Sequence, residues 1–134
     1  MEKICVPVSP GELLDKITIL EIKVQQIADT EKLRNVKIEL ELLNQAWEKT
    51  HVDDSSIKLL KQSLRAVNQD LWSIEDRIRI KESQKNFDEG FIELARSVYL
   101  RNDRRAAIKK EINTLLGSVI VEEKSYASYQ SPVD

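Results

Sequence analysis

The chain has 134 residues, and its 21 basic and 23 acidic side chains leave a formal net charge of −2 at pH 7. This near balance gives no general reason to expect a nucleic acid or an anionic membrane surface as a partner. Hydrophobic residues make up 41% of the chain, charged residues 33% and aromatic residues only 5%, which is typical of long amphipathic helices rather than of a disordered chain or a β-sandwich.

No targeting or membrane segment is predicted. The start of the chain lacks the basic and then apolar pattern of a signal peptide, and no apolar run approaches the roughly 20 residues that span a bilayer. The single cysteine, Cys5, excludes a disulfide within one chain. We therefore expect a cytoplasmic protein without membrane insertion, in which Cys5 is a buried and unreactive thiol.

The first predicted helix covers residues 10–28. Ser9 stands before Pro10, and Glu12 follows, so a serine N-cap, a proline at the first helical position and a capping glutamate come together. Apolar residues then recur at spacings of three and four as far as Ile27. This spacing predicts an amphipathic helix whose broad apolar face is buried.

Two further helices are predicted after a break in the apolar register. The six-residue step from Ile27 to Leu33 indicates a turn, and the second helix then covers residues 31–49. The third covers residues 55–85, and apolar residues follow heptad spacing over positions 57–78. Because this seam is long for a small monomer to cover, we expect a homodimer.

The last predicted helix covers residues 90–116. Asp88 is a candidate N-cap for it, and Gly117 is placed to end it in the left-handed conformation. The polar tail is residues 118–134. We therefore expect one all-α domain, residues 1–134, with four helical segments in a bundle and a long antiparallel C-terminal helical hairpin.

Short β-branched runs lie just outside the helices at both ends of the chain. Residues 4–8 and 119–121 are the two runs. They either pair as a two-stranded β element or lie over the helices without pairing.

A basic segment, residues 96–110, holds six bases and one acid. It includes three neighbouring arginines, Arg101, Arg104 and Arg105. Desolvating an unpaired charge costs several kcal/mol. These guanidinium groups therefore need either carboxylates within the protein or an anionic ligand.

The third and fourth predicted helices offer such carboxylates. If the two helices pair antiparallel about Asp88, Glu75 lies opposite Arg101, Asp76 is beside it, and Trp72 lies near Arg104. The first interpretation is a salt-bridge layer that fixes the register of the hairpin. The second is an anion-binding pocket, since guanidinium groups suit bidentate contacts with phosphate and carboxylate. The candidate ligand-binding residues are Arg96, Arg101, Arg104, Arg105, Glu75 and Asp76.

Other polar residues give weaker signals. Glu12 and Asp15 form an E-x-x-D pair that suits a divalent metal, but carboxylates three residues apart are common on charged helices. His51 is the only histidine and has no partner at metal-ligand spacing. We therefore predict neither a metal site nor a cofactor, and we leave open whether the protein is an enzyme.

Three stretches resemble a family of short helical proteins of unknown function that occurs in proteobacteria and marine phage. They are VPVSPGELLDK at 6–16, LWSIED at 71–76, and FIELAR at 91–96 with NDRR at 102–105, and the tail at 122–126 is also similar. The resemblance covers nearly the whole chain. It implies a gene neighbourhood of surface-polysaccharide assembly, and hence a sugar nucleotide or phosphorylated saccharide as a candidate anion.

Two hypotheses about function follow. In the first, the protein is a non-catalytic adaptor or assembly protein, linked to surface-polysaccharide biosynthesis, whose arginines only set helix register. In the second, Arg101, Arg104 and Arg105 bind a phosphorylated or carboxylated small molecule, such as a nucleotide, a sugar nucleotide or a dicarboxylate, and the protein acts on it.

Overall fold

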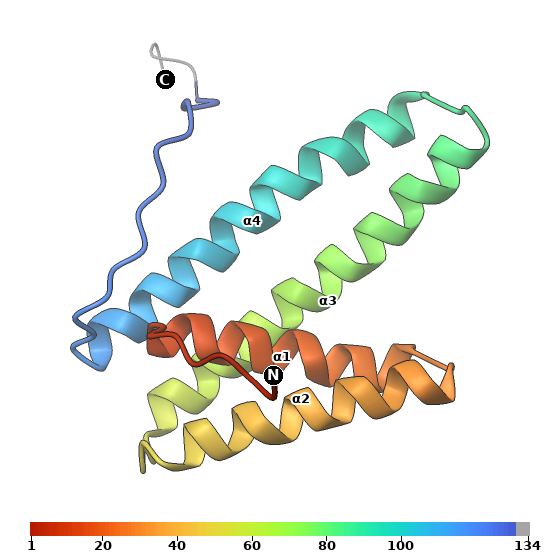
Figure 1. Ribbon diagram of the computed structural model, residues 1–134. Coiled ribbons are helices and arrows are strands. Elements are labelled where there is room, and N and C mark those ends of the chain that lie inside the picture. Colours follow the sequence, from red (N-terminus) through yellow and green to blue (C-terminus); the bar gives the residue numbers. More distant parts are fainter. Residues whose placement is uncertain (131–134) are drawn as a thin grey trace.

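Four helices form the secondary structure of the part of the chain that the computed structural model describes, residues 1–130 (Figure 1). The predicted all-helical class and the four helices are confirmed. Residues 131–134, the end of the predicted tail, lie outside the described residues. The helices are α1 (Pro10–Gln26), α2 (Thr30–Glu48), α3 (Ser55–Ser83) and α4 (Glu89–Leu115).

Side-chain caps fix where the helices begin. Ser9 Oγ accepts a hydrogen bond of 3.1 Å from the backbone N–H of Glu12, and Asp88 caps α4 in the same way through the N–H of Phe91 at 2.9 Å. At the far end, Gly117 has a φ of 62° and terminates α4. These caps confirm the residues that the sequence predicts for them.

The ends of the chain do not form the expected β element. Residues 1–130 contain no strand, and the side chains of Ile4, Val6 and Val119 are exposed. An isolated two-stranded ribbon is only marginally stable, and Pro7 removes one backbone donor from the ladder. The thiol of Cys5 is exposed as well, so the prediction of a buried cysteine is wrong.

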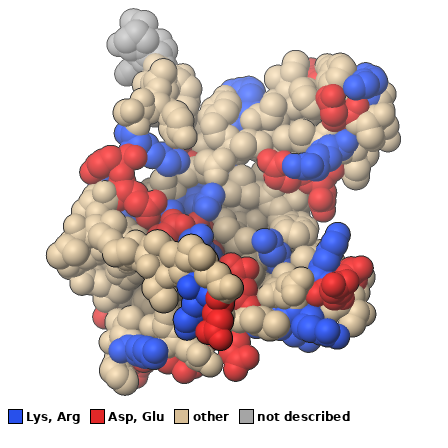
Figure 2. Space-filling model, in the orientation of Figure 1, with Lys and Arg blue, Asp and Glu red and all other residues tan. Residues whose placement is uncertain are grey.

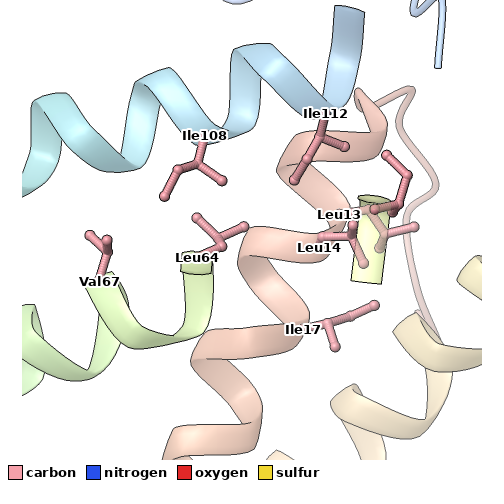
Figure 3. Close-up of a cluster of buried hydrophobic side chains, with 8 residues drawn as sticks. Leu13, Leu14, Ile17, Leu64, Val67, Ile108 and Ile112 are labelled. Atoms are coloured by element: carbon pink, nitrogen blue, oxygen red, sulfur yellow. The ribbon is translucent and has the colours of Figure 1, made fainter. Parts of the chain in front are cut away.

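The core is built around α1, which packs against each of the other three helices. Leu14 and Ile17 of α1 have 0% and 1% of their surface exposed. They meet Leu64 of α3 and Ile108 of α4 (Figure 3). Burial of this apolar surface is the main favourable contribution to folding. The full cluster is Leu13, Leu14, Ile17, Ile57, Leu64, Val67, Ile108 and Ile112.

Part of α3 and α4 extends beyond this core. The two helices pack against each other and meet at the turn of residues 84–88, at the end of the molecule far from α2 (Figure 1). We call residues 74–100 the arm. Within the arm only Ile74 and Leu94 are buried.

The tail runs back beside α4. Lys124 Nζ donates to the carbonyl oxygen of Asn102 at 3.4 Å, and the rings of Tyr129 and Tyr99 lie 5.1 Å apart. Among residues 1–130, no helix has both the length and the apolar character needed to cross a bilayer.

Candidate functional site

The carboxylate of Asp15 on α1 is fully buried, with 0% of the residue exposed. Arg105 of α4 donates from Nε to both carboxylate oxygens, at 2.9 and 3.0 Å, and from Nη2 to Oδ2. Asn68 of α3 donates from Nδ2 to Oδ1 at 2.8 Å. A carboxylate buried in this way needs such charged and hydrogen-bonding partners. Three helices therefore meet at one acidic side chain.

The ammonium group of Lys109 extends this arrangement to the tail. It forms ion pairs with Glu12 and, at 3.0 Å, with Glu122, and it lies 3.8 Å from Asp15 Oδ2. Ser9 Oγ donates to Glu122 Oε1 at 3.1 Å. The start of α1, the end of α4 and the tail are thus held together. We call this set of residues the Asp15 cluster: Glu12, Asp15, Asn68, Arg105, Lys109 and Glu122.

The two cations of the Asp15 cluster are held in their charged forms. The hydrogen bonds to Asp15 raise the pKa of the Arg105 guanidinium above its ordinary range and outweigh the opposing effect of burial. Burial has the largest single effect and lowers the pKa of the Lys109 ammonium, but the hydrogen bonds to Glu12 and Glu122 and the negative charges of Asp15 and Glu12 together outweigh it, so that the pKa is raised. Each cation is matched by carboxylates of the protein itself.

The charges of the cluster leave no excess of positive charge for an anion. Three carboxylates, those of Glu12, Asp15 and Glu122, face the two cations Arg105 and Lys109. One interpretation of the sequence was a salt-bridge layer between the third and fourth helices. The ion pairs of the Asp15 cluster do join helices, but they join α4 to α1 rather than to α3. Within residues 1–130, no group of three or more His, Cys, Asp or Glu side chains is placed to hold a metal ion.

The prediction that Glu75 lies opposite Arg101 is wrong. Arg101 Nε lies 3.5 Å from Asp70 Oδ2, and Glu75 forms an ion pair with Arg79 on its own helix at 3.6 Å. The prediction centred the turn on Asp88, whereas the turn covers residues 84–88 and is centred two residues earlier. Moving the centre by two residues shifts every facing pair by about four residues, which is one helical turn.

The six candidate residues separate into two groups. Glu75, Asp76 and Arg105 line one groove of about 520 Å³ between α1, α3 and α4, together with Trp72. Arg96, Arg101 and Arg104 do not line this groove and are exposed. In the view of Figure 2, acidic and basic side chains are intermixed over the surface rather than gathered in a patch of one sign.

Arg96 lies beside an aromatic residue of its own helix. The neighbouring side chain of Tyr99 raises the pKa of the Arg96 guanidinium, and Arg96 is exposed to solvent. Solvated charges of this kind add little to stability.

The sequence signals for Asp15, Asn68 and Lys109 were weak. Asp15 belongs to the E-x-x-D pair, and Lys109 belongs to the basic segment, but neither pattern names a partner. Gly11 marks a second contact between the same helices, because its backbone N–H donates to Asn113 Oδ1 at 2.7 Å where α1 crosses α4. A glycine near a helix start permits such a close approach, but sequence does not say to which helix.

Lys109 makes stability depend on pH in the alkaline range. Its pKa in the folded protein is above the ordinary value of 10.5, so this contribution is complete below that value and is lost as the pH rises through the folded pKa. We expect the free energy of unfolding to fall less steeply in Lys109→Met than in the wild type, measured by urea unfolding between about pH 9 and pH 12.

Lys58 provides the matched control for this pH dependence. Its pKa is also raised, by the hydrogen bond to Asp53, but this pair is exposed. Because solvent screens this exposed pair, Lys58→Met should change the slope much less than Lys109→Met does. An unchanged slope in Lys109→Met would show that its ammonium group is not linked to folding.

Comparisons with known proteins match the chain to a family model. No curated protein and no solved structure matches the chain. A family model described as a family of unknown function, DUF6165, matches residues 4–133. This match supports the resemblance to a family of unknown function, and the organisms and gene neighbourhood that the resemblance implies stay predictions. Because the matched region covers almost all of its residues, the chain belongs to this family, DUF6165.

Proposed function

We propose that this protein is a non-catalytic assembly protein that pairs with a second copy of itself through the arm. The observation that carries the proposal is the exposure of large apolar side chains along the arm, away from the core. These residues are Ile80 (56% exposed), Phe87 (53%), Ile92 (53%), Tyr99 (40%) and Leu100 (45%).

Some of the apolar residues of the arm share a helix face or contact another ring. Ile92 and Tyr99 are seven residues apart on α4 and therefore share one face of that helix. Phe87 in the turn lies edge to face with Phe91, with ring centroids 5.2 Å apart. Exposed apolar patches mark interaction sites in soluble proteins, and these residues are the candidates for such a patch on the arm.

Because the arm consists of only two helices, a second arm is the favoured partner for its exposed apolar surface. A pair of helices buries one seam between them and leaves its two outer sides uncovered. If the arm acts as an antiparallel hairpin, two copies complete a four-helix bundle and cover one such side on each. The heptad residues of α3 do not add to this surface, because Ile57, Leu64, Val67 and Ile74 are buried within the chain.

Light scattering of the purified protein tests the proposal. We expect a mass twice that of the 15.5 kDa chain, and we expect the double variant Ile92→Glu/Leu100→Glu to be monomeric at the same micromolar concentration while its helical circular dichroism is unchanged. Charges in the buried centre of an interface are strongly unfavourable.

The second helix supplies the control for this experiment. Ile38 and Leu42 of α2 are 54% and 41% exposed and resemble the arm residues in size and exposure. Ile38→Glu/Leu42→Glu should remain dimeric. A monomeric wild type, or dissociation by the α2 variant alone, would contradict pairing through the arm.

The second hypothesis, an anionic ligand at Arg101, Arg104 and Arg105, has less support. The guanidinium of Arg105 is occupied by Asp15, and Arg101 has Asp70 as its neighbour. Thermal shifts with phosphate, nucleotides, sugar nucleotides and dicarboxylates would test it. The cytoplasmic location and the link to surface-polysaccharide biosynthesis stay predictions, as does the nature of any substrate.

A further inference from the structure

We propose that the groove between α1, α3 and α4 binds a small organic ammonium compound with an apolar, preferably aromatic, body. The charge of this ligand is opposite to the one that the arginine-rich sequence predicts. The inference rests on the groove and its charged rim, and it is independent of pairing through the arm.

The size and the lining of the groove suit a small molecule. Its volume of about 520 Å³ lies within the range of about 300–1,000 Å³ that is usual for ligand pockets. Ile19 and Ile22 of α1 and Leu71 of α3 supply apolar surface, and the half-buried indole of Trp72 lies among them. An apolar ring gains by leaving water for such a surface.

The inner end of the groove does not attract an anion. Arg105 lines the groove, but its Nε and Nη2 already donate to the fully buried carboxylate of Asp15. Its Nη1 has a long contact of 3.5 Å with Asn102 Oδ1. A ligand carboxylate at this guanidinium would lie close to Asp15, and two like charges in a partly buried site repel each other.

The rim of the groove attracts a cation instead. Glu75 and Asp76 both line it on α3. Glu75 has one long ion pair with Arg79, at 3.6 Å, in which Arg79 is 81% exposed. Within residues 1–130, the carboxylate of Asp76 has neither an ion pair nor a hydrogen bond. Arg79 lines the groove as well, so two carboxylates, of Glu75 and Asp76, stand with two guanidinium groups, of Arg79 and Arg105. Because buried Asp15 already neutralises Arg105, the remaining lining charges are two acids and one base.

Trp72 adds a second attraction for the same kind of ligand. The face of an indole is the most favourable aromatic surface for a cation, and the neighbouring carboxylates provide the counter-charge. An ammonium group at the rim and an apolar ring against Leu71 and Ile19 would therefore use both parts of the lining.

Three probes of nearly equal shape test the charge preference: 2-phenylethylamine, 2-phenylethanol and 3-phenylpropionate. The protein would carry Trp47→Phe, so that the fluorescence excited at long wavelength comes from Trp72 alone. We expect saturable binding of 2-phenylethylamine at low ionic strength, about three- to tenfold tighter than that of the alcohol. We expect no saturable binding of the carboxylate.

Substitutions on α3 locate the bound ammonium group. Asp76→Asn should weaken binding of 2-phenylethylamine about threefold or more and leave binding of 2-phenylethanol unchanged. Glu82→Gln removes an exposed carboxylate of the same helix that does not line the groove, and it should leave the affinity for both probes unchanged. Circular dichroism would show that both variants keep their helices.

Three results would overturn the proposal. One is tighter binding of 3-phenylpropionate than of the amine, which would restore the anion hypothesis. Another is the absence of saturable binding for all three probes. The last is an equal loss of affinity in Asp76→Asn and Glu82→Gln, because a change of that kind would reflect the overall charge of the protein rather than a site.

Discussion

Replacing Asp15 by asparagine is expected to destabilise the fold by about 3–5 kcal/mol, the usual cost of breaking a buried ion pair from one side. The substitution keeps the size of the side chain but leaves the half-buried guanidinium of Arg105 without its buried counter-charge. One of the ion-pair partners of Lys109 is lost as well. The free energy of unfolding in urea at pH 7 measures the effect.

A paired substitution separates the ion pair from general packing. In Asp15→Leu/Arg105→Met both charges are removed together, and we expect a large part of the lost stability to return, because no uncompensated charge remains. Glu75→Gln is the matched acidic control. Its ion pair with Arg79 is exposed, so the change should stay within about 0.5 kcal/mol. A cost below about 1 kcal/mol for Asp15→Asn would mean that solvent reaches this carboxylate.

Gly11→Ala is expected to cost about 1–3 kcal/mol, as overpacking of a close helix contact does. A Cβ atom at Gly11 would lie 2.6 Å from the backbone carbonyl oxygen of Lys109 and 2.8 Å from Asn113 Oδ1. The carbonyl belongs to α4 and cannot rotate away, so α1 and α4 would have to separate. Separation would also stretch the hydrogen bond from the Gly11 N–H to Asn113.

Gly90→Ala is the control for Gly11→Ala, because Gly90 has only side-chain atoms close to the position of an added Cβ. Gly90 lies in the first turn of α4, where an added Cβ would meet Lys81 Nζ and Asp88 Oδ1 at 3.3 Å. The lysine is a flexible chain that can move aside, and alanine has the better helix propensity. We expect a change between zero and about 1 kcal/mol of added stability. Equal losses in the two variants would contradict a specific close approach at Gly11.

The helices themselves followed from local sequence. A serine or aspartate N-cap, apolar residues at spacings of three and four, and a terminal glycine act within one or two turns of the chain. For this reason the four helices and the caps Ser9 and Asp88 are as predicted. The extended ends were wrongly considered for pairing, because a β-branched run indicates strand propensity but supplies no partner strand.

The candidate site was predicted only in part. Glu75, Asp76, Trp72 and Arg105 do line one groove. The carboxylates expected near the arginines as a group were those of the third helix, whereas Arg105 binds Asp15 of α1. A turn centre misplaced by two residues is within the normal uncertainty of helix boundaries. Because an error of even one residue in the turn centre brings different side chains to face each other, the prediction of side-chain partners fails before the prediction of the helices does.

The sequence by itself determined the helical class, the number of helices and the residues that begin and end them, since these depend on contacts between residues that are close in the chain. Only the tertiary structure decided that α1 lies at the centre, that Asp15 receives Arg105, and that Glu122 of the tail reaches Lys109. Asp15 and Arg105 are 90 residues apart. A local pattern shows that a buried charge needs a partner, but the packing of three helices decides which of the 23 acids supplies it.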